Sequence, residues 1–264
     1  MSIEAIIPLD AGWIERALLL SDEAGWNQTA ADWAAFMAHG AVLGVVADDR
    51  LVATAAALPY GREFGWVSMV LVSQDWRGRG IATRLAAACT SLLRDAGSAA
   101  FLDATPAGAA VYARLGFVPL CAMQRWQGQG GAAHAPGATA DLSLDRLAFG
   151  ADRRFLLEDF LSRPGSLGFA SQGSFALLRQ GARAMHVGPA VGEPAAALPL
   201  VMGALAAARG TVLVDVLEAA YSMIPALAAQ GFRMQRRFTR MALGRTALPG
   251  NPARLLAAAG PEFG

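Results

Sequence analysis

Residues 66–82 read Trp-Val-Ser-Met-Val-Leu-Val, then Ser-Gln-Asp-Trp, then Arg-Gly-Arg-Gly-Ile-Ala. The first seven residues form the short apolar run of a buried strand, and the next four form a polar turn. The last six open a helix whose apolar positions recur on one face, at Ile81, Leu85, Cys89 and Leu92. A strand, a glycine loop and a helix therefore follow one another directly.

A second strand and a second helix continue this unit. Gly97 can end the first helix, residues 99–103 form a short apolar strand, and Pro106 suits the first turn of a helix that ends at Gly116. Because strands joined by a helical crossover pair in parallel, strands 66–72 and 99–103 are expected to be parallel neighbours.

The glycine loop is suited to hold an anion. Two glycines at a helix entry let the backbone approach a ligand, and the free N–H groups and the helix dipole favour negative charge there. Arg77 and Arg79 add positive charge, so a phosphate or pyrophosphate is the natural ligand, with a solvated basic turn as the alternative. A Walker A loop is excluded because the chain has no lysine, and a dinucleotide fingerprint because Thr83 holds the third glycine position.

This loop resembles the acetyl-CoA-binding motif of the GCN5-related N-acetyltransferase (GNAT) superfamily. That motif is Gln or Arg, two residues, Gly, one residue, then Gly or Ala, and it is matched by Arg77, Gly80 and Ala82. Tyr112 and the Gly-Phe pair at 116–117 are similar to a second family pattern, and residues 24–27 and 102–108 look like one bacterial branch of the superfamily.

The resemblance implies acetyl-CoA as cosubstrate. The loop would bind the CoA pyrophosphate, and the preceding strand edge would pair with pantetheine and polarise the acetyl carbonyl through a backbone N–H. This requires strands 66–72 and 99–103 to splay apart at their C-terminal ends. The expected cofactor-binding residues are Val70, Leu71, Val72, Arg77, Gly78, Arg79, Gly80, Ile81 and Ala82.

Tyr112 is the candidate general acid. An unperturbed tyrosine has a pKa of ~10 and a thiol of ~8.5, so Tyr112 is protonated at neutral pH and can share its proton with a departing thiolate. The alternative is that Tyr112 only packs beside its neighbours. The general base stays open, since Asp103 could also cap the following helix, Glu23 and Glu63 lie in turns, and members of the superfamily often deprotonate the amine through water.

Trp26 and Asn27 are the candidate acceptor-site residues. They stand in a polar turn between the first two predicted helices, and the second of these helices starts with Thr29 and Asp32. In GNAT folds this segment commonly covers the acceptor site. The alternative for Trp26 is a packing anchor.

Composition excludes several other classes of protein. The chain has 264 residues and a net charge of +1, with no block of like charges that would mark nucleic-acid binding. No apolar run approaches the ~20 residues of a membrane span, and the first residues do not form a signal peptide, so a cytoplasmic protein is expected. Cys89 and Cys121 are interpreted as core residues, and the three histidines stand too far apart to indicate a metal site.

The second half repeats the order of elements of the first. The expected fold class is α/β (α+β, GNAT-type), with two tandem GNAT-like domains. Each would be a mixed, mostly antiparallel sheet with a central parallel splayed strand pair flanked by helices. We predict a catalytic domain at 1–126, whose strand 118–126 completes its sheet, a flexible linker at 127–140, and a degenerate GNAT-like domain at 141–264. In the copy, Leu227 replaces Tyr112, and Glu193 would repel a pyrophosphate.

The expected function is transfer of an acetyl group from acetyl-CoA to the primary amine of a small molecule through a direct ternary complex. The alternative is a non-catalytic acyl-CoA-binding or interaction protein. The sequence leaves open the acceptor, the acyl chain preference, the oligomeric state, including a homodimer, and whether the second domain shapes the acceptor pocket.

Overall fold

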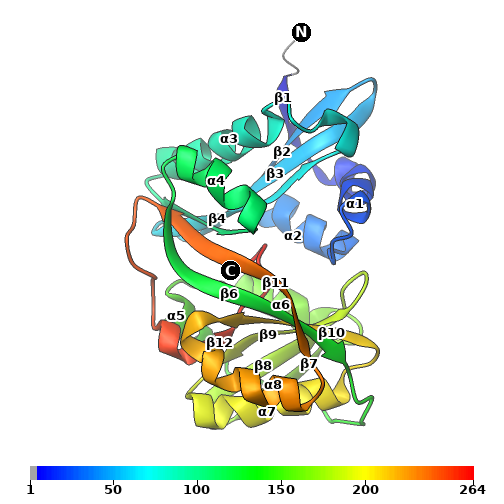
Figure 1. Ribbon diagram of the computed structural model, residues 1–264, viewed down its shortest axis with the longest axis vertical. Coiled ribbons are helices and arrows are strands. Elements are labelled where there is room, and N and C mark those ends of the chain that lie inside the picture. The colour runs from blue at the N-terminus through cyan, green and yellow to red at the C-terminus, as the bar shows by residue number, and fades with distance from the viewer. Residues whose placement is uncertain (1–4) are drawn as a thin grey trace.

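The computed structural model describes residues 5–264, and Figure 1 shows them as two halves stacked along the long axis. The elements of the first half are β1 (Ile6–Leu9), α1 (Ile14–Glu23), α2 (Ala30–His39), β2 (Ala41–Ala47), β3 (Arg50–Tyr60), β4 (Phe64–Val72), α3 (Ile81–Asp95), β5 (Ala99–Ala104), α4 (Pro106–Arg114) and β6 (Val118–Gln129). The elements of the second half are α5 (Ser143–Phe149), α6 (Arg154–Ser162), β7 (Leu167–Ser171), β8 (Ser174–Arg179), β9 (Met185–Val191), α7 (Pro194–Ala207), β10 (Thr211–Leu217), α8 (Ile224–Ala229), β11 (Arg233–Leu243) and β12 (Leu255–Ala257).

Strands of both halves join in one twelve-stranded sheet over the described residues. Its order is β1-β2-β3-β4-β5-β11-β6-β10-β12-β9-β8-β7. The strand beside β5 is therefore β11 from the second half, and the predicted strand 118–126, which is β6, lies between β11 and β10. At twelve residues, β6 spans about 40 Å, long enough to run alongside β11 from one half into the other (Figure 1).

The two central strands of the first half are parallel and splayed, as expected. Pairing between β4 and β5 covers Phe64 with Ala99, Gly65 with Ala100 and Trp66 with Phe101, and it ends there. The second half has the same design, because β9 and β10 pair in parallel over three positions, from Val212 with Met185 to Val214 with Val187. This repeated arrangement matches the internal duplication inferred from element order.

The gap in the second splay is filled by the chain itself. β12, which the sequence analysis did not predict, lies between β9 and β10 and pairs antiparallel with both. Ala257 stands opposite Ala190 of β9 and Val216 of β10, and the N–H of Ala258 donates to the carbonyl of Asp215. The C-terminal strand therefore occupies the place that corresponds to the open slot of the first half.

Local sequence signals explain several element boundaries. Thr29 and Asp32 form a capping box at the start of α2, and Gly97 has a positive φ just after α3, both as predicted. On α3, Ile81, Leu85 and Cys89 are buried, but Leu92 is 44% exposed. The core position in the last turn belongs to Leu93 instead, since an i to i+4 spacing from Cys89 continues the buried face.

The predicted linker 127–140 is tied to the second half. β6 continues to Gln129, and the N–H groups of Gly130 and Ala138 then donate to the carbonyls of Gly210 and Gly168. A Cβ at position 130 would lie 2.1 Å from the carbonyl oxygen of Ala208. The small residues therefore serve close packing against the second half, which differs from the expectation of a flexible linker. The apolar residues at 3–9 predict a first strand, of which residues 3 and 4 lie outside the described part of the chain.

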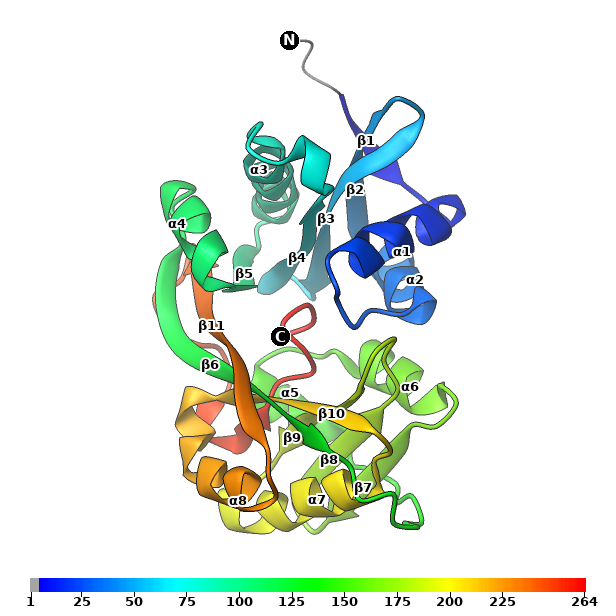
Figure 2. The ribbon, with the colours of Figure 1, turned by 45° about the vertical axis from the view of Figure 1, so that its right-hand side comes forward.

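The C-terminal tail lies between the two halves (Figures 1 and 2). Its aromatic Phe263 stacks on Phe36 of α2 and contacts Phe160 of α6, and its carbonyl accepts from the Tyr60 hydroxyl at 2.7 Å. The Trp66 indole N–H donates to the carbonyl of Pro261 at 2.9 Å. The tail is thus part of the core that joins the halves.

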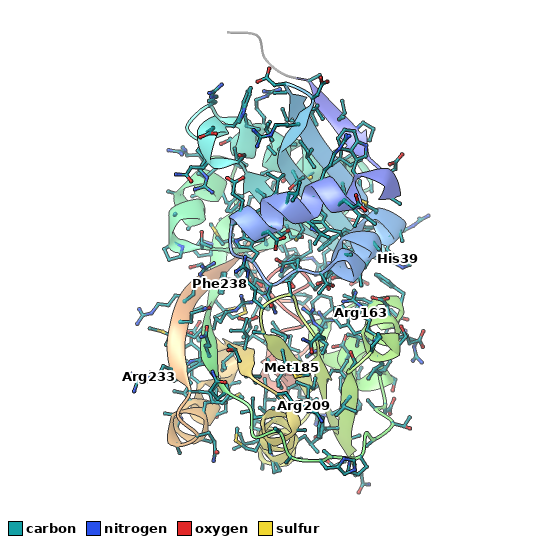
Figure 3. The ribbon with its side chains drawn as sticks, turned by 90° about the vertical axis from the view of Figure 1, so that its right-hand side faces the viewer. His39, Arg163, Met185, Arg209, Arg233 and Phe238 are labelled. Carbon is teal, nitrogen blue, oxygen red and sulfur yellow. The ribbon has the colours of Figure 1, made fainter. Side chains whose placement is uncertain are left out.

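Buried charges add a second tie between the halves. Asp32 of α2 accepts from Arg163 at 2.6 Å and from Arg179 at 3.4 Å (Figure 3 places Arg163 close to the first half). Burial opposes ionisation of Asp32, but Arg179 and Arg163, together with the Thr29 N–H, outweigh it and lower the pKa of this carboxyl.

No helix among residues 5–264 is both long and apolar enough to cross a bilayer.

The buried pair Arg153–Asp145 provides a test of how the tail is held. Arg153 donates to both oxygens of Asp145, at 2.8 and 2.9 Å, and to the carbonyl of Phe263 at 3.1 Å. Replacing it, Arg153→Met, leaves a buried carboxylate without its partner, so the free energy of unfolding should fall by about 3–5 kcal/mol in a urea titration. The double variant with Asp145→Leu should recover part of that loss. Equal stability of Arg153→Met and the wild type would contradict this account.

Candidate active site

A cavity of about 390 Å³ lies between the two halves. The first half contributes the turn at 25–28, the end of β4, the end of β5 and Tyr112 of α4. The second half contributes the loop before β9, parts of β10 and β11, and Pro261 and Glu262 of the tail, while β6 supplies two further residues. Trp26, Asn27, Val70 and Tyr112, all predicted from sequence, line this one cavity. Leu71, Val72 and residues 77–82 lie outside its lining.

A bulge in β4 opens the slot beside the cavity. Thr54 of β3 pairs with Leu71 and Ala56 pairs with Ser68, so Met69 and Val70 stand opposite one residue, and Met69 has a φ of 52°. The Thr54 hydroxyl donates to the Met69 carbonyl at 2.9 Å and holds this conformation. Beyond Trp66, β5 therefore no longer pairs with β4, which leaves the strand edge at 70–72 available to an extended ligand.

The glycine loop has the geometry of an anion site. Gly78 and Gly80 have φ values of 77° and 76°, and within residues 5–264 nothing lies within 4 Å of a Cβ added at either. α3 starts at Ile81, and no side chain of the described residues caps its first N–H groups. Arg77 donates to the Val72 carbonyl at 3.0 Å, and the Arg79 guanidinium lies 4.3 Å from the Trp76 ring centroid. These residues fit a pyrophosphate.

Tyr112 is placed to keep its proton. Its ring packs edge-on against Phe117 at 6.1 Å, and the lack of a side chain at Gly108 leaves it room, since a Cβ there would lie 3.0 Å from the ring. Burial raises the pKa of Tyr112 to about 12, with a smaller contribution from Cys89. The hydroxyl is therefore protonated throughout the neutral range. Although Tyr112 is largely buried, it still lines the cavity.

Asn27 lines the cavity but also binds the second half. Its amide nitrogen donates to the Ala184 carbonyl at 3.0 Å, and its amide oxygen accepts from the N–H groups of Arg183 and Ala184, each at 2.9 Å. The side chain thereby fixes the loop before β9 as a wall of the cavity. Local sequence patterns carry no signal for this contact, because it joins residues more than 150 positions apart. The neighbouring Trp26 is partly buried in the same wall.

The carboxylates near the cavity differ in how far they are paired. Both oxygens of Asp103 accept from Arg240 at 2.9 Å, so neither oxygen is left without a partner. The N-terminal cap of α4 is Thr105, not Asp103. Glu23 accepts from the Ser73 hydroxyl and the Gln74 N–H and lies outside the lining. Glu262, in the tail, accepts from Arg179 through Oε1 at 3.1 Å. Glu262 was not among the residues predicted from sequence, because it follows Gly260 and Pro261 without any periodic signal.

A buried triad supports the cavity wall behind Arg125. Arg125 donates to both oxygens of Asp215, at 2.8 and 2.7 Å, and the Nε2 of His186 lies 2.9 Å from the same carboxylate. Burial lowers the pKa of His186 despite Asp215, so the imidazole is neutral and donates its Nε2 hydrogen. Burial opposes ionisation of Asp215, but Arg125 beside it outweighs this and lowers its pKa well below the usual range.

The corresponding site in the second half is closed. Glu193 stands at the start of α7 and pairs with Arg254, so the acid that was expected to repel a pyrophosphate holds the segment leading to β12.

Among residues 5–264 no three His, Cys, Asp or Glu side chains gather as metal ligands would. Cys89 is buried and Cys121 is partly buried, and burial raises the thiol pKa values to about 12 and about 11.

Two sequence models of acetyltransferases match the chain. Residues 13–117 match one described as "Acetyltransferase (GNAT) family", and residues 142–257 match one described as "Acetyltransferase (GNAT) domain". None of the curated proteins matches the chain by sequence.

Solved structures resemble the chain over nearly its whole length. A Pyrococcus horikoshii protein described as a "putative acetyltransferase" is 18% identical, with a TM-score of 0.85 over 100% of this chain and 98% of its own. A tandem GNAT protein from the clavulanic acid biosynthesis pathway is 16% identical, with a TM-score of 0.62 over 91% and 98%. A GCN5-related N-acetyltransferase from Sphaerobacter thermophilus is 14% identical, with a TM-score of 0.60 over 93% and 96%. At these identities the likeness shows the fold.

The glycine loop can be tested by Gly80→Asp. The substitution adds a carboxylate where a pyrophosphate is expected and strains a positive φ, so binding of CoA should be lost in a calorimetric titration. Gly173→Asp is the matched control, because Gly173 has a φ of 72° and equally open surroundings in the β7–β8 turn. CoA binding that survives in Gly80→Asp would place the site elsewhere.

The buried triad predicts a pH dependence of stability. Because the folded pKa of His186 lies below its ordinary value of ~6.5, the unfolded chain takes up a proton that the folded chain does not. Stability should be complete above pH ~6.5 and fall as the pH drops below it, by at most about 1.4 kcal/mol per pH unit from this residue. His186→Gln should reduce that slope between pH 7 and 5 in denaturant titrations, whereas the exposed His134→Gln should not. Equal slopes in all three proteins would exclude this role of His186.

Proposed function

The chain belongs to the GCN5-related N-acetyltransferase superfamily and carries one GNAT domain in each half, and from this we propose that it acetylates the primary amine of a small molecule with acetyl-CoA. It is an acyltransferase, and the substrate and mechanism are the proposed part. One observation supports the proposal. The open slot between β4 and β5 and the Tyr112 side chain border the same cavity.

Residues of the first half would hold the cosubstrate. The N–H groups at the start of α3, with Arg77 and Arg79, would bind the pyrophosphate, and the strand edge at 70–72 would pair with pantetheine. Bound acetyl-CoA supplies the acetyl thioester. The cavity of about 390 Å³ lies within the range of ~300–1,000 Å³ for small-molecule sites, so the amine can reach the thioester directly in a ternary complex.

In the transfer, the amine nitrogen forms a bond to the acetyl carbon as the carbon–sulfur bond breaks. The amine loses one proton to solvent water, and the sulfur takes one proton from Tyr112, which regains it from solvent. A pKa of about 12 keeps the Tyr112 hydroxyl protonated and available as this donor at neutral pH. A non-catalytic CoA-binding protein would not need the hydroxyl group.

The variant Tyr112→Phe tests this proposal. Turnover, measured as free thiol released from acetyl-CoA in the presence of an amine, should fall about 100-fold or more, while CoA affinity stays within about twofold. Tyr221→Phe is the matched control, because Tyr221 lies in the second half outside the cavity lining. Unchanged turnover in Tyr112→Phe would remove Tyr112 from the mechanism.

A further inference from the structure

The buried end of the cavity contains polar atoms that lack a partner. The side chains of Gln28 and Ser68 are 6% and 8% exposed, and neither Gln28 Oε1 nor Ser68 Oγ has a hydrogen-bond partner within the part of the chain that the structure describes. Glu262, 7% exposed, lines the same cavity and accepts from Arg179 through Oε1. Carboxylate and amide oxygens accept hydrogen bonds, so this end suits the N–H groups of an amine.

The exposed end of the cavity carries guanidinium groups instead. Arg183 and Arg236 both line it and are exposed. The Arg183 guanidinium donates to the main-chain carbonyl of Asp22 at 3.1 Å and lies 4.0 Å from a carboxylate oxygen of the same residue. With both side chains more than half exposed, this ion pair contributes little. Within residues 5–264, the Arg236 side chain has no hydrogen-bond or ion-pair partner.

Arg236 stands directly opposite Arg125 on the neighbouring strand β6, and no acid among the described residues of the cavity balances its charge. Arg125 is neutralised by its bidentate pair with Asp215, and the acids of the cavity, Asp103 and Glu262, are likewise paired with arginines. The cavity therefore keeps an excess of positive charge at its exposed end, which an anionic ligand would balance.

Resting on the proposed function, we propose that the acceptor is an amine that also carries a carboxylate. Its amino group lies at the buried end, against Glu262, Ser68 and Gln28, close to the β4 edge. Its carboxylate lies at the exposed end, between Arg236 and Arg183. The second half then determines acceptor specificity, because both arginines and Glu262 belong to it.

Matched pairs of amines test the carboxylate. Thiol release from acetyl-CoA is measured with 4-aminobutyrate against butylamine, and with 6-aminohexanoate against hexylamine. The amino acids should have a kcat/KM at least about tenfold above that of the alkylamines, since a charge-assisted contact to arginine is gained only with the carboxylate. An alkylamine that reacts as well as its amino acid would overturn the proposal.

Two arginine variants on one strand locate the carboxylate site. Arg236→Gln should lower kcat/KM for the amino acid and abolish its preference over the alkylamine. Arg233→Gln is the matched control, because Arg233 is an exposed residue of β11 outside the cavity lining and lies at the outer side of the second half (Figure 3). Equal preferences in both variants would contradict the assignment of Arg236.

Calorimetry separates this proposal from the proposed function. Glutarate, which has carboxylates but no amine, is titrated into the full chain saturated with CoA, and Arg236→Gln should weaken its binding at least about tenfold relative to Arg233→Gln. If no amine releases thiol but glutarate binds through Arg236, the acetyl transfer fails while the anion site stands. If amines react and glutarate binding does not depend on Arg236, the anion site fails while the acetyl transfer stands.

Discussion

Antiparallel pairing of β6 with β11 is the interaction on which the rest of the structure depends. Each strand comes from one half, and together they lie between β5 and β10, so the two sheets become one. Hydrogen bonds along two strands of eleven and twelve residues fix the angle and spacing of the halves far more tightly than a surface contact would. The cavity lies in the space that this pairing leaves between them, and its walls are held in a single geometry.

The same constraint gives the second half a role although its own slot is closed. In the first half the splay beyond Trp66 is open, whereas in the second half β12 lies in the equivalent gap. That strand leads directly into the tail, whose Glu262 lines the cavity and whose Phe263 packs between α2 and α6. β12, which fills the gap of the second half, thus anchors the tail that completes the cavity wall beside the open slot of the first half. Asn27 has the complementary role, since it binds the loop of the second half that carries Arg183.

Features set by neighbouring residues could be predicted from the sequence. The glycine loop, the capping box at Thr29 and the parallel pair of strands 66–72 and 99–103 all depend on residues close in the chain or on one helical crossover. Tyr112, Trp26, Asn27 and Val70 were each named separately, and the structure brings them to one cavity.

Features set by distant partners could not be predicted. The pattern of apolar and polar residues in β11 is the same whether this strand pairs with β5 or with strands of its own half. Pairing of β11 with the first half therefore leaves no local signal in the sequence. β12 is only three residues long and directly follows a short 3-10 helix at Pro252–Arg254, and Glu262 carries no motif. Leu92 and Leu93 are adjacent and equally apolar, so helical periodicity alone did not choose the buried one.

Stoichiometry of acetyl-CoA binding tests the central claim most directly, namely that the chain has one open slot and one slot filled by its own C-terminal strand. The full chain is titrated with acetyl-CoA in a calorimeter, at a protein concentration well above the dissociation constant. The account predicts one equivalent per chain. Two equivalents would mean that β12 leaves its gap for the ligand, and no binding would mean that the open splay of β4 and β5 is not an acetyl-CoA site.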